Sequence, residues 1–209
     1  MLSIIIITLN EEKYLPKLLD SIKRQKFYDY EVIVSDGNSN DATRKIARKY
    51  DCKVLVGNRS PSIQRNAGAR AANGNLLLFL DADVILPENF LMNLVKEIHG
   101  KNLDVGTCYV GVYDGSFSDK FIFAWQNFFT SLLGKVWPHA FGCCIFSKPT
   151  VHRKIKGFDK SISWFEDTDY VKRASKEFKF GILNNLKVLT SSRRWKKEGR
   201  LRLIAKHAV

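Results

Sequence analysis

The sequence lacks the features of metal-clustered, disulfide-rich or membrane-spanning proteins. Its 209 residues include four cysteines, none in a Cys-x-x-Cys pair, and Cys143 and Cys144 are direct neighbours. A zinc cluster or a disulfide framework is therefore not expected, whereas free thiols in a reducing compartment are. No apolar run approaches the roughly 20 residues that a membrane-spanning helix needs.

The apolar start of the chain is short. Met1 to Thr8 is followed at once by Asn10, Glu11 and Glu12, with neither a basic leader nor a small-residue cleavage site. We interpret this segment as a buried strand rather than as a signal peptide. The expected location is the cytoplasm, with a peripheral position on the cytoplasmic face of a membrane as an open alternative.

Acidic residues are scarce beside basic ones. Lys and Arg number 34 and Asp and Glu number 21, which gives a net charge of +13 and a pI near 9.6. This excess indicates an anionic partner, and nucleic acid, an anionic membrane surface and a phosphorylated small molecule all fit it. The hydrophobic fraction of 45% and the charged fraction of 26% are typical of a globular protein.

Internal repeats and Gly/Ser-rich linkers are also absent, so we predict one domain over 1–209 with halves at 1–100 and 101–209. The first half alternates between β-branched apolar runs and segments with helical spacing. The predicted strands are 3–8, 30–35, 53–56 and 76–80, and the predicted helices are 10–22, 42–50, 62–73 and 87–98. This alternation predicts an α/β fold with a mostly parallel central sheet flanked by helices.

The second half is less regular. We predict strands at 103–112 and 140–146, a helix from about 166 to 178, and a strand pair at 180–183 and 187–190 across Asn184–Asn185. The aromatic segment 117–137 has apolar residues at spacings of three and four, which predicts a helix or a helical hairpin. It can be a core helix or a face at a membrane boundary, and the sequence leaves both open.

Three polar clusters follow the predicted parallel strands, at Thr8–Glu11, Asp36–Asp41 and Asp81–Asp83. In an open α/β sheet, ligands bind beyond the carboxyl ends of the strands, so we expect these clusters to line one site. Carboxylates at spacing two share one side of an extended segment and suit Mg²⁺ or Mn²⁺ with a diphosphate. Two turn or capping aspartates before Pro87 are the alternative.

Five motifs follow one another along the chain: SIIIITLNEE (3–12), EVIVSDGNSNDAT (31–43), QRNAGARAANGNLLLFLDAD (64–83), GFDKSISWFEDTDYVKRA (157–174) and SSRRW (191–195). In this order they resemble the motifs of family 2 glycosyltransferases of the GT-A fold. The resemblance implies a Rossmann-like nucleotide-sugar-binding half and a smaller acceptor-binding half. It also implies an enzyme that transfers a hexose-type sugar, with inversion, from a nucleoside diphosphate to a hydroxyl or phosphate acceptor.

The resemblance assigns the donor site residue by residue. Thr8, Asn10 and Glu11 match the lining of the base and ribose pocket, Asp36 the acid that bonds the nucleobase, and Arg65 a basic residue near the nucleotide. The donor is expected to be of the UDP or GDP type. Neither the base nor the sugar is encoded by a residue that we can identify.

The metal and its neighbours are assigned in the same way. Asp83 matches the ligand of a divalent metal, Mn or Mg, and Asp81 faces the ribose or the metal. Relatives often carry another polar group two residues later, but this chain has Ile85 there. We therefore expect fewer protein ligands and more water on the metal.

For catalysis, the resemblance makes Asp167 the general base and Glu166 its acidic neighbour. Glu166 and Asp169 should raise the pKa of Asp167 because their charges are negative. Acids that complement a helix N-terminus are the alternative. The expected diphosphate and acceptor contacts are Trp164, Arg193, Arg194 and Trp195.

The acceptor side is less determined. Basic residues outnumber acids seven to one between Arg193 and Lys206, and such clusters attract anionic lipid headgroups. Together with the aromatic segment 117–137, this favours a peripheral membrane enzyme with a lipid-linked acceptor. A solvated basic tail is the alternative, and the oligomeric state stays open.

Two other functions are considered. A sugar-phosphate nucleotidyltransferase would need a Gly-rich, Arg-containing loop after the first strand, but Thr8–Glu12 contains no glycine. A non-catalytic basic module would bind membranes or nucleic acid through its positive net charge alone. We expect no nucleic-acid partner, because acidic residues occupy the predicted ligand edge.

Overall fold

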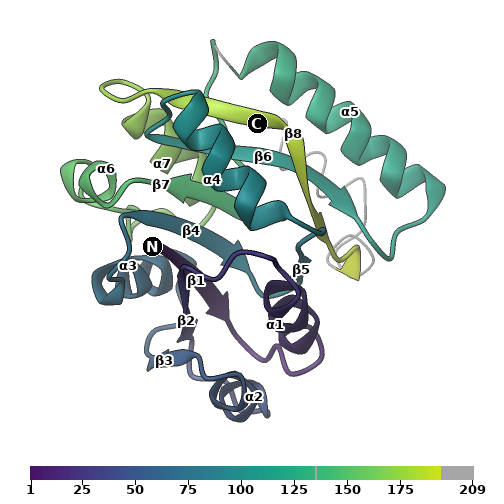
Figure 1. Cartoon of the computed structure of the whole chain (residues 1–209), viewed down its shortest axis with the longest axis vertical. Helices are drawn as coiled ribbons and strands as arrows, with labels where there is room; N and C mark the ends of the chain where they lie inside the picture. Colours follow the sequence, from purple (N-terminus) through teal and green to yellow (C-terminus); the bar gives the residue numbers. More distant parts are fainter. Residues whose placement is uncertain (135, 194–209) are drawn as a thin grey trace.

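The computed structural model describes residues 1–134 and 136–193. Within them, eight strands form one curled sheet in the order β3-β2-β1-β4-β7-β6-β8-β5 (Figure 1). The strands are β1 (Leu2–Thr8), β2 (Tyr30–Asp36), β3 (Lys53–Val56), β4 (Leu76–Asp81), β5 (Val84–Ile85), β6 (Val105–Val112), β7 (Cys144–Ser147) and β8 (Phe180–Thr190). The helices are α1 (Leu15–Lys23), α2 (Thr43–Lys49), α3 (Pro61–Ala71), α4 (Phe90–Gly100), α5 (Phe117–Leu133), α6 (Pro149–Lys154) and α7 (Glu166–Ala174).

The first half confirms the predicted parallel sheet. β1 pairs in parallel with β2 and β4, and β2 pairs in parallel with β3. The register sets Thr8 beside Asp36 and Ile7 beside Asp81, so the three polar clusters leave the sheet at one edge. The sheet as a whole is mixed, because β7 runs antiparallel to β4 and β6, and β5 runs antiparallel to β8.

The core lies on both faces of the sheet, as the continuous apolar strands predict. On one face, Ile4 and Ile6 of β1 pack with α1 and α4. On the other, Ile5 of β1 and Phe79 of β4 pack with α6 and α7. Alternate residues of one strand therefore support helices on opposite faces, which anchors the site edge from both sides.

The predicted hairpin at 180–190 is wrong. Residues 180–190 form the single strand β8, which pairs in parallel with β6 and has a register shift beside Cys108 and Tyr109. Asn184–Asn185 therefore lies in an irregular part of the strand rather than in a turn, because β6 pairs with the residues before it and with those after it. The strand predicted at 140–146 is shorter, since β7 begins at Cys144, and α6 was not predicted.

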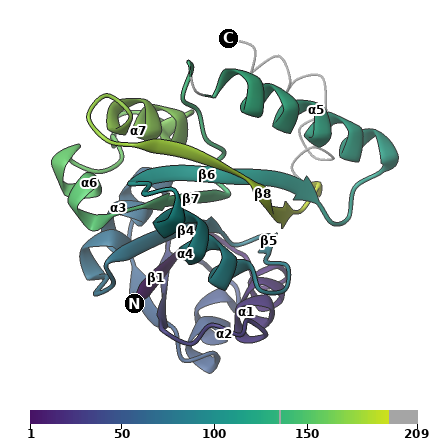
Figure 2. The same cartoon turned by 45° about the horizontal axis from the view of Figure 1, so that its top comes forward.

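Helix α5 is one helix that lies at the edge of the molecule, beside β6 and β8 (Figures 1 and 2). A capping box between Ser116 and Asp119 starts it. Its buried side is mostly polar: the Asn127 amide accepts from Val110 N at 3.0 Å and donates to Val110 O at 2.8 Å. No helix in the described residues is long and apolar enough to cross a membrane.

This anchoring predicts the effect of Asn127→Ala. The substitution leaves both backbone groups of Val110 without their partner inside the protein, so it should lower the free energy of unfolding by about 1–3 kcal/mol. Urea unfolding followed by circular dichroism measures the change. The control is Gln126→Ala on the same helix, which should stay within about 0.5 kcal/mol of the wild type. An equal decrease in the free energy of unfolding in the two variants would contradict the assigned role of Asn127.

Candidate functional site

Hydrogen bonds between the ends of β1 and β2 build the floor of the site. Asp36 is fully buried and accepts bonds from Thr8 Oγ1 at 2.8 Å and from Ser39 N at 2.8 Å. The Ser39 hydroxyl also donates to Asp36, and the Thr8 N–H donates to Gln64 Oε1 at 3.0 Å. The Asp36 carboxylate therefore holds two loops together, and its bond to a nucleobase stays a prediction.

The loop after β1 is locked to the loop after β2. Asn10 has a positive φ of 57°, its N–H donates to Ser39 Oγ at 2.8 Å, and its Oδ1 accepts from Asn40 N at 2.9 Å. The Glu11 N–H donates to Thr43 Oγ1 at 2.7 Å. These contacts aim the Glu11 side chain at the site. Ser39 lies in the predicted Asp36–Asp41 cluster, whereas Thr43 was not among the predicted site residues.

Arg193, from the other end of the chain, closes this edge. Its Nε lies 3.0 Å from Asp83 Oδ2, its Nη2 lies 2.5 Å from Glu11 Oε1, and its guanidinium carbon lies 4.1 Å from the centre of the Tyr14 ring. Asp114, which sequence reasoning missed, holds the preceding segment by accepting from Ser191 Oγ at 2.7 Å and from Ser192 N.

The carboxylates around Arg193 are crowded. Burial and the negative charge of Asp81 raise the pKa of Asp83, which Arg193 partly counteracts. Burial also raises the pKa of Glu11, again against the influence of Arg193. Glu11 Oε2 is buried and has no hydrogen-bond partner among the described residues. The cluster therefore holds more negative charge than Arg193 alone compensates.

The carboxylates of this cluster are of the chemical type that divalent cations prefer. Its donors are hard carboxylate oxygens, and the unpartnered Glu11 Oε2 adds a buried negative group beside Asp81 and Asp83. Within residues 1–134 and 136–193, no group of three or more His, Cys, Asp or Glu side chains is arranged to hold a metal ion. Any cation here would thus have few protein ligands and would need other oxygens.

Arg65 on α3 joins the second group of carboxylates. Its side chain is only 2% exposed, with Nη2 3.0 Å from Asp81 Oδ1 and Nη1 2.6 Å from Glu166 Oε1. Burial alone would lower the pKa of this guanidinium, but Asp81, Glu166 and Asp167 raise it. Arg65 is thus a buried bridge between β4 and α7, and its predicted place near the nucleotide is not tested.

The Asp167 carboxyl group has a raised pKa. Burial of its carboxyl group and the charge of Glu166 raise its pKa to about 6, although Arg65 and a backbone hydrogen bond from Gly142 act in the opposite direction. A Cβ on Gly142 would lie 2.7 Å from Arg65 Nη2 and 3.2 Å from Asp167 Oδ2, so only glycine allows this approach.

Helix α7, which carries Asp167 in its first turn, begins in an unusual way. Phe165 precedes the helix with a φ of 62°, a left-handed conformation that is strained for a bulky residue. It turns Glu166 and Asp167 into the first turn of α7, where acids also suit the helix dipole. Trp164 is half-exposed in the preceding loop. Arg194 and Trp195 lie outside the described residues.

Two solved structures resemble this fold over most of the chain. TarS of Staphylococcus aureus, residues 1–349 in complex with UDP-GlcNAc, has a TM-score of 0.72 at 20% identity, over 91% of this chain and 58% of that one. The mannosyltransferase PcManGT of Pyrobaculum calidifontis, in complex with GDP-Man and Mn²⁺, has a TM-score of 0.73 at 20% identity, over 99% and 64%. The likeness confirms the GT-A-like fold.

Two relatives match about half of the sequence. Validoxylamine A glucosyltransferase of Streptomyces hygroscopicus subsp. limoneus is 33% identical over 122 residues, which are 52% of this chain and 27% of the relative. The GalNAc(5)-diNAcBac-PP-undecaprenol beta-1,3-glucosyltransferase of Campylobacter jejuni is 33% identical over 129 residues, 57% of this chain and 41% of the relative. The chain matches less than half the length of either protein.

The family model described as Glycosyl transferase family 2 matches residues 3–156. This range contains the polar ends of β1, β2 and β4, with Arg65 and Gly142 between or beside them. Because the match covers more than half of the sequence, the chain belongs to glycosyl transferase family 2.

Proposed function

We propose that this protein transfers a sugar, with inversion, from a nucleoside diphosphate sugar to a hydroxyl acceptor. The observation that carries the proposal is Asp167, whose pKa is raised to about 6 and whose neighbour Glu166 is joined through Arg65 to Asp81. One end of this network can accept a proton, while the carboxylates at the other end can hold the cation that neutralises a leaving diphosphate. Family membership supports the same activity.

Asp167 is the proposed general base. In an inverting transfer, the acceptor hydroxyl attacks the anomeric carbon from the side opposite to the diphosphate, and its proton passes to the base. The oxygen–carbon bond forms as the carbon–phosphate-oxygen bond breaks, and the electron pair leaves with the diphosphate. Glu166, held 2.6 Å from Arg65, maintains the raised pKa and orients the start of α7.

Asp83 and Asp81 are the residues that would hold a divalent metal, Mg²⁺ or Mn²⁺. Such a cation, when bound, neutralises charge on the departing diphosphate. With Ile85 where relatives often have a polar group, diphosphate oxygens and water would complete its coordination. Arg193, about one third exposed beside Asp83, adds a positive charge to which phosphate oxygens can bind.

The donor and the acceptor belong to the same proposal. UDP- and GDP-type donors are both retained, since one structural neighbour is in complex with UDP-GlcNAc and another with GDP-Man and Mn²⁺. Thr8, Asn10, Glu11 and Asp36 would line the base and ribose pocket, and Trp164 would face the acceptor. The name of the Campylobacter relative, which contains an undecaprenol-linked sugar, supports a lipid-linked acceptor. A peripheral place on the cytoplasmic face of a membrane would suit such an acceptor.

Donor binding is tested by thermal unfolding with UDP, GDP and their sugar conjugates, each with and without Mn²⁺. One nucleoside diphosphate should stabilise the protein in a metal-dependent way, because a ligand at about 100 times its Kd adds about 2.7 kcal/mol. Asp83→Ala should abolish the metal-dependent part. The control Asp29→Ala changes an exposed carboxylate that pairs with the N-terminus and should leave the shift unchanged. Unchanged melting with every nucleotide would contradict the proposal.

Catalysis by Asp167 predicts a pH profile. The base acts as a carboxylate, so kcat/KM should fall tenfold per pH unit below about pH 6, the value to which its pKa is raised. Glu166→Gln removes a negative neighbour, so the pKa of Asp167 should fall and the acidic limb should move to lower pH.

The matched test is Asp167→Asn. It should reduce sugar transfer by about 100- to 10,000-fold while nucleotide binding, measured by thermal shift, survives. Retention of transfer in Asp167→Asn, or an acidic limb that moves upward in Glu166→Gln, would refute the assignment of the base.

A further inference from the structure

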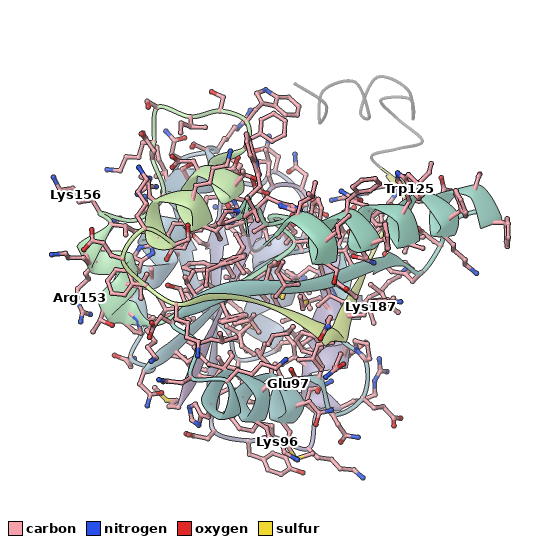
Figure 3. All side chains as sticks on the ribbon, turned by 90° about the horizontal axis from the view of Figure 1, so that it is seen from above. Lys96, Glu97, Trp125, Arg153, Lys156 and Lys187 are labelled. Atoms are coloured by element: carbon pink, nitrogen blue, oxygen red, sulfur yellow. The ribbon has the colours of Figure 1, made fainter. Side chains whose placement is uncertain are left out.

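Helix α5 turns its apolar side chains outward. Phe117, Phe121, Trp125, Phe128 and Leu132 follow one another at spacings of four, four, three and four, so they form one stripe, with Phe129 and Leu133 beside it. Exposed fractions run from 37% for Phe129 to 87% for Phe117. We call these seven residues the aromatic ridge. Figure 3 labels Trp125 on the side of α5 away from β6.

The orientation of α5 is determined by polar contacts on its other side. Asn127 bonds both backbone groups of Val110, and Thr130 Oγ1 lies 2.9 Å from His139 Nε2. Phe123 is the large apolar side chain of α5 that is buried among the described residues. Rotating the helix to bury the ridge would break these bonds, so the ridge is a surface of this fold.

The ridge is continuous. Trp125 and Phe129 pack edge to face with ring centres 4.9 Å apart, and Phe128 lies 5.8 Å from Phe129. Contiguous exposed apolar groups of this kind mark an interaction site rather than ordinary surface. Trp and Phe on one side of a helix, with a polar opposite side, are typical of helices that lie in a membrane interface.

Just before the basic residues of the sequence, the chain passes beside the start of α5. Ser191 and Ser192 bond Asp114, which lies two residues before the Ser116 cap of α5. The sequence that follows Arg193 therefore leaves the described structure beside the start of α5. It contains six basic residues and one acid up to Lys206, and Lys120 on α5 is exposed.

We propose that the aromatic ridge docks on an anionic lipid surface. The rings would enter the headgroup boundary while the basic residues bind acidic headgroups. A second copy of the chain is a poorer occupant, because two chains that each carry a net charge of +13 repel each other.

Docking would bring the catalytic edge close to the membrane. The Ser191 N–H donates to Asp83 O at 3.2 Å, and Arg193 contacts Asp83 and Glu11. The segment that leads to the basic residues is therefore attached to the proposed donor site. The inference deepens the proposed function, since its use rests on a lipid-linked acceptor, but membrane binding itself can be measured without catalysis.

The test is sedimentation with phosphatidylcholine vesicles and with vesicles of phosphatidylcholine and phosphatidylglycerol at 3:1. The wild type should bind the anionic vesicles, less so at high salt. The variant Trp125→Ser, Phe128→Ser, Phe129→Ser should bind at least tenfold more weakly. A control with three exposed apolar residues elsewhere, Tyr28→Ser, Val56→Ser, Met92→Ser, should stay within twofold of the wild type.

Two readouts separate this inference from the proposed function. The nucleotide thermal shift should be unchanged in the ridge variant. Loss of vesicle binding with an unchanged thermal shift would show that the ridge binds the membrane independently of donor binding. In a variant whose sole tryptophan is Trp125, brominated lipid should quench the tryptophan fluorescence. Equal vesicle binding by the ridge variant and the control would overturn the inference, as would a dimer in light scattering that the ridge variant abolishes.

Discussion

The buried ion pairs of Arg65 hold the site together. This side chain of α3 lies between Asp81 at the end of β4 and Glu166 at the start of α7, residues that are 85 positions apart in the chain. A buried arginine must keep its carboxylate partners, because an uncompensated charge in the interior is very costly. The position of Asp167 follows from this constraint, and Gly142 leaves the space that it requires.

A second arginine repeats the arrangement at the outer edge of the site. Arg193 bridges Glu11 and Asp83, but it is about one third exposed, whereas Arg65 is nearly fully buried. The difference in exposure suits different tasks. Arg65 is a fixed structural bridge, and Arg193 is a cation that incoming phosphate groups can reach. Asp81 pairs with Arg65, and its negative charge also acts on Asp83, the partner of Arg193.

Strand patterns predicted the first half well, since β1, β2 and β4 are buried on both faces and end in polar clusters that the parallel register aligns. Arg65, Glu166 and Asp167 could be recognised only through motif resemblance. Asp114 and Gly142 had no usable signal: Asp114 resembles a turn residue, and Gly142 matters only because two distant side chains meet above it. The 180–190 segment was misjudged because its pairing partner, β6, lies about 75 residues earlier.

The sequence by itself determined the α/β class, the family resemblance, the edge at which the polar residues gather and the excess of positive charge. Local spacing carries this information, because strand and helix periods depend on neighbouring residues. The tertiary structure alone decided which charges pair, and which side of α5 faces outward. Helical spacing cannot distinguish a buried apolar stripe from an exposed one. Here the hydrogen bonds of Asn127 to Val110 hold the polar side of α5 against β6, so the apolar stripe faces outward.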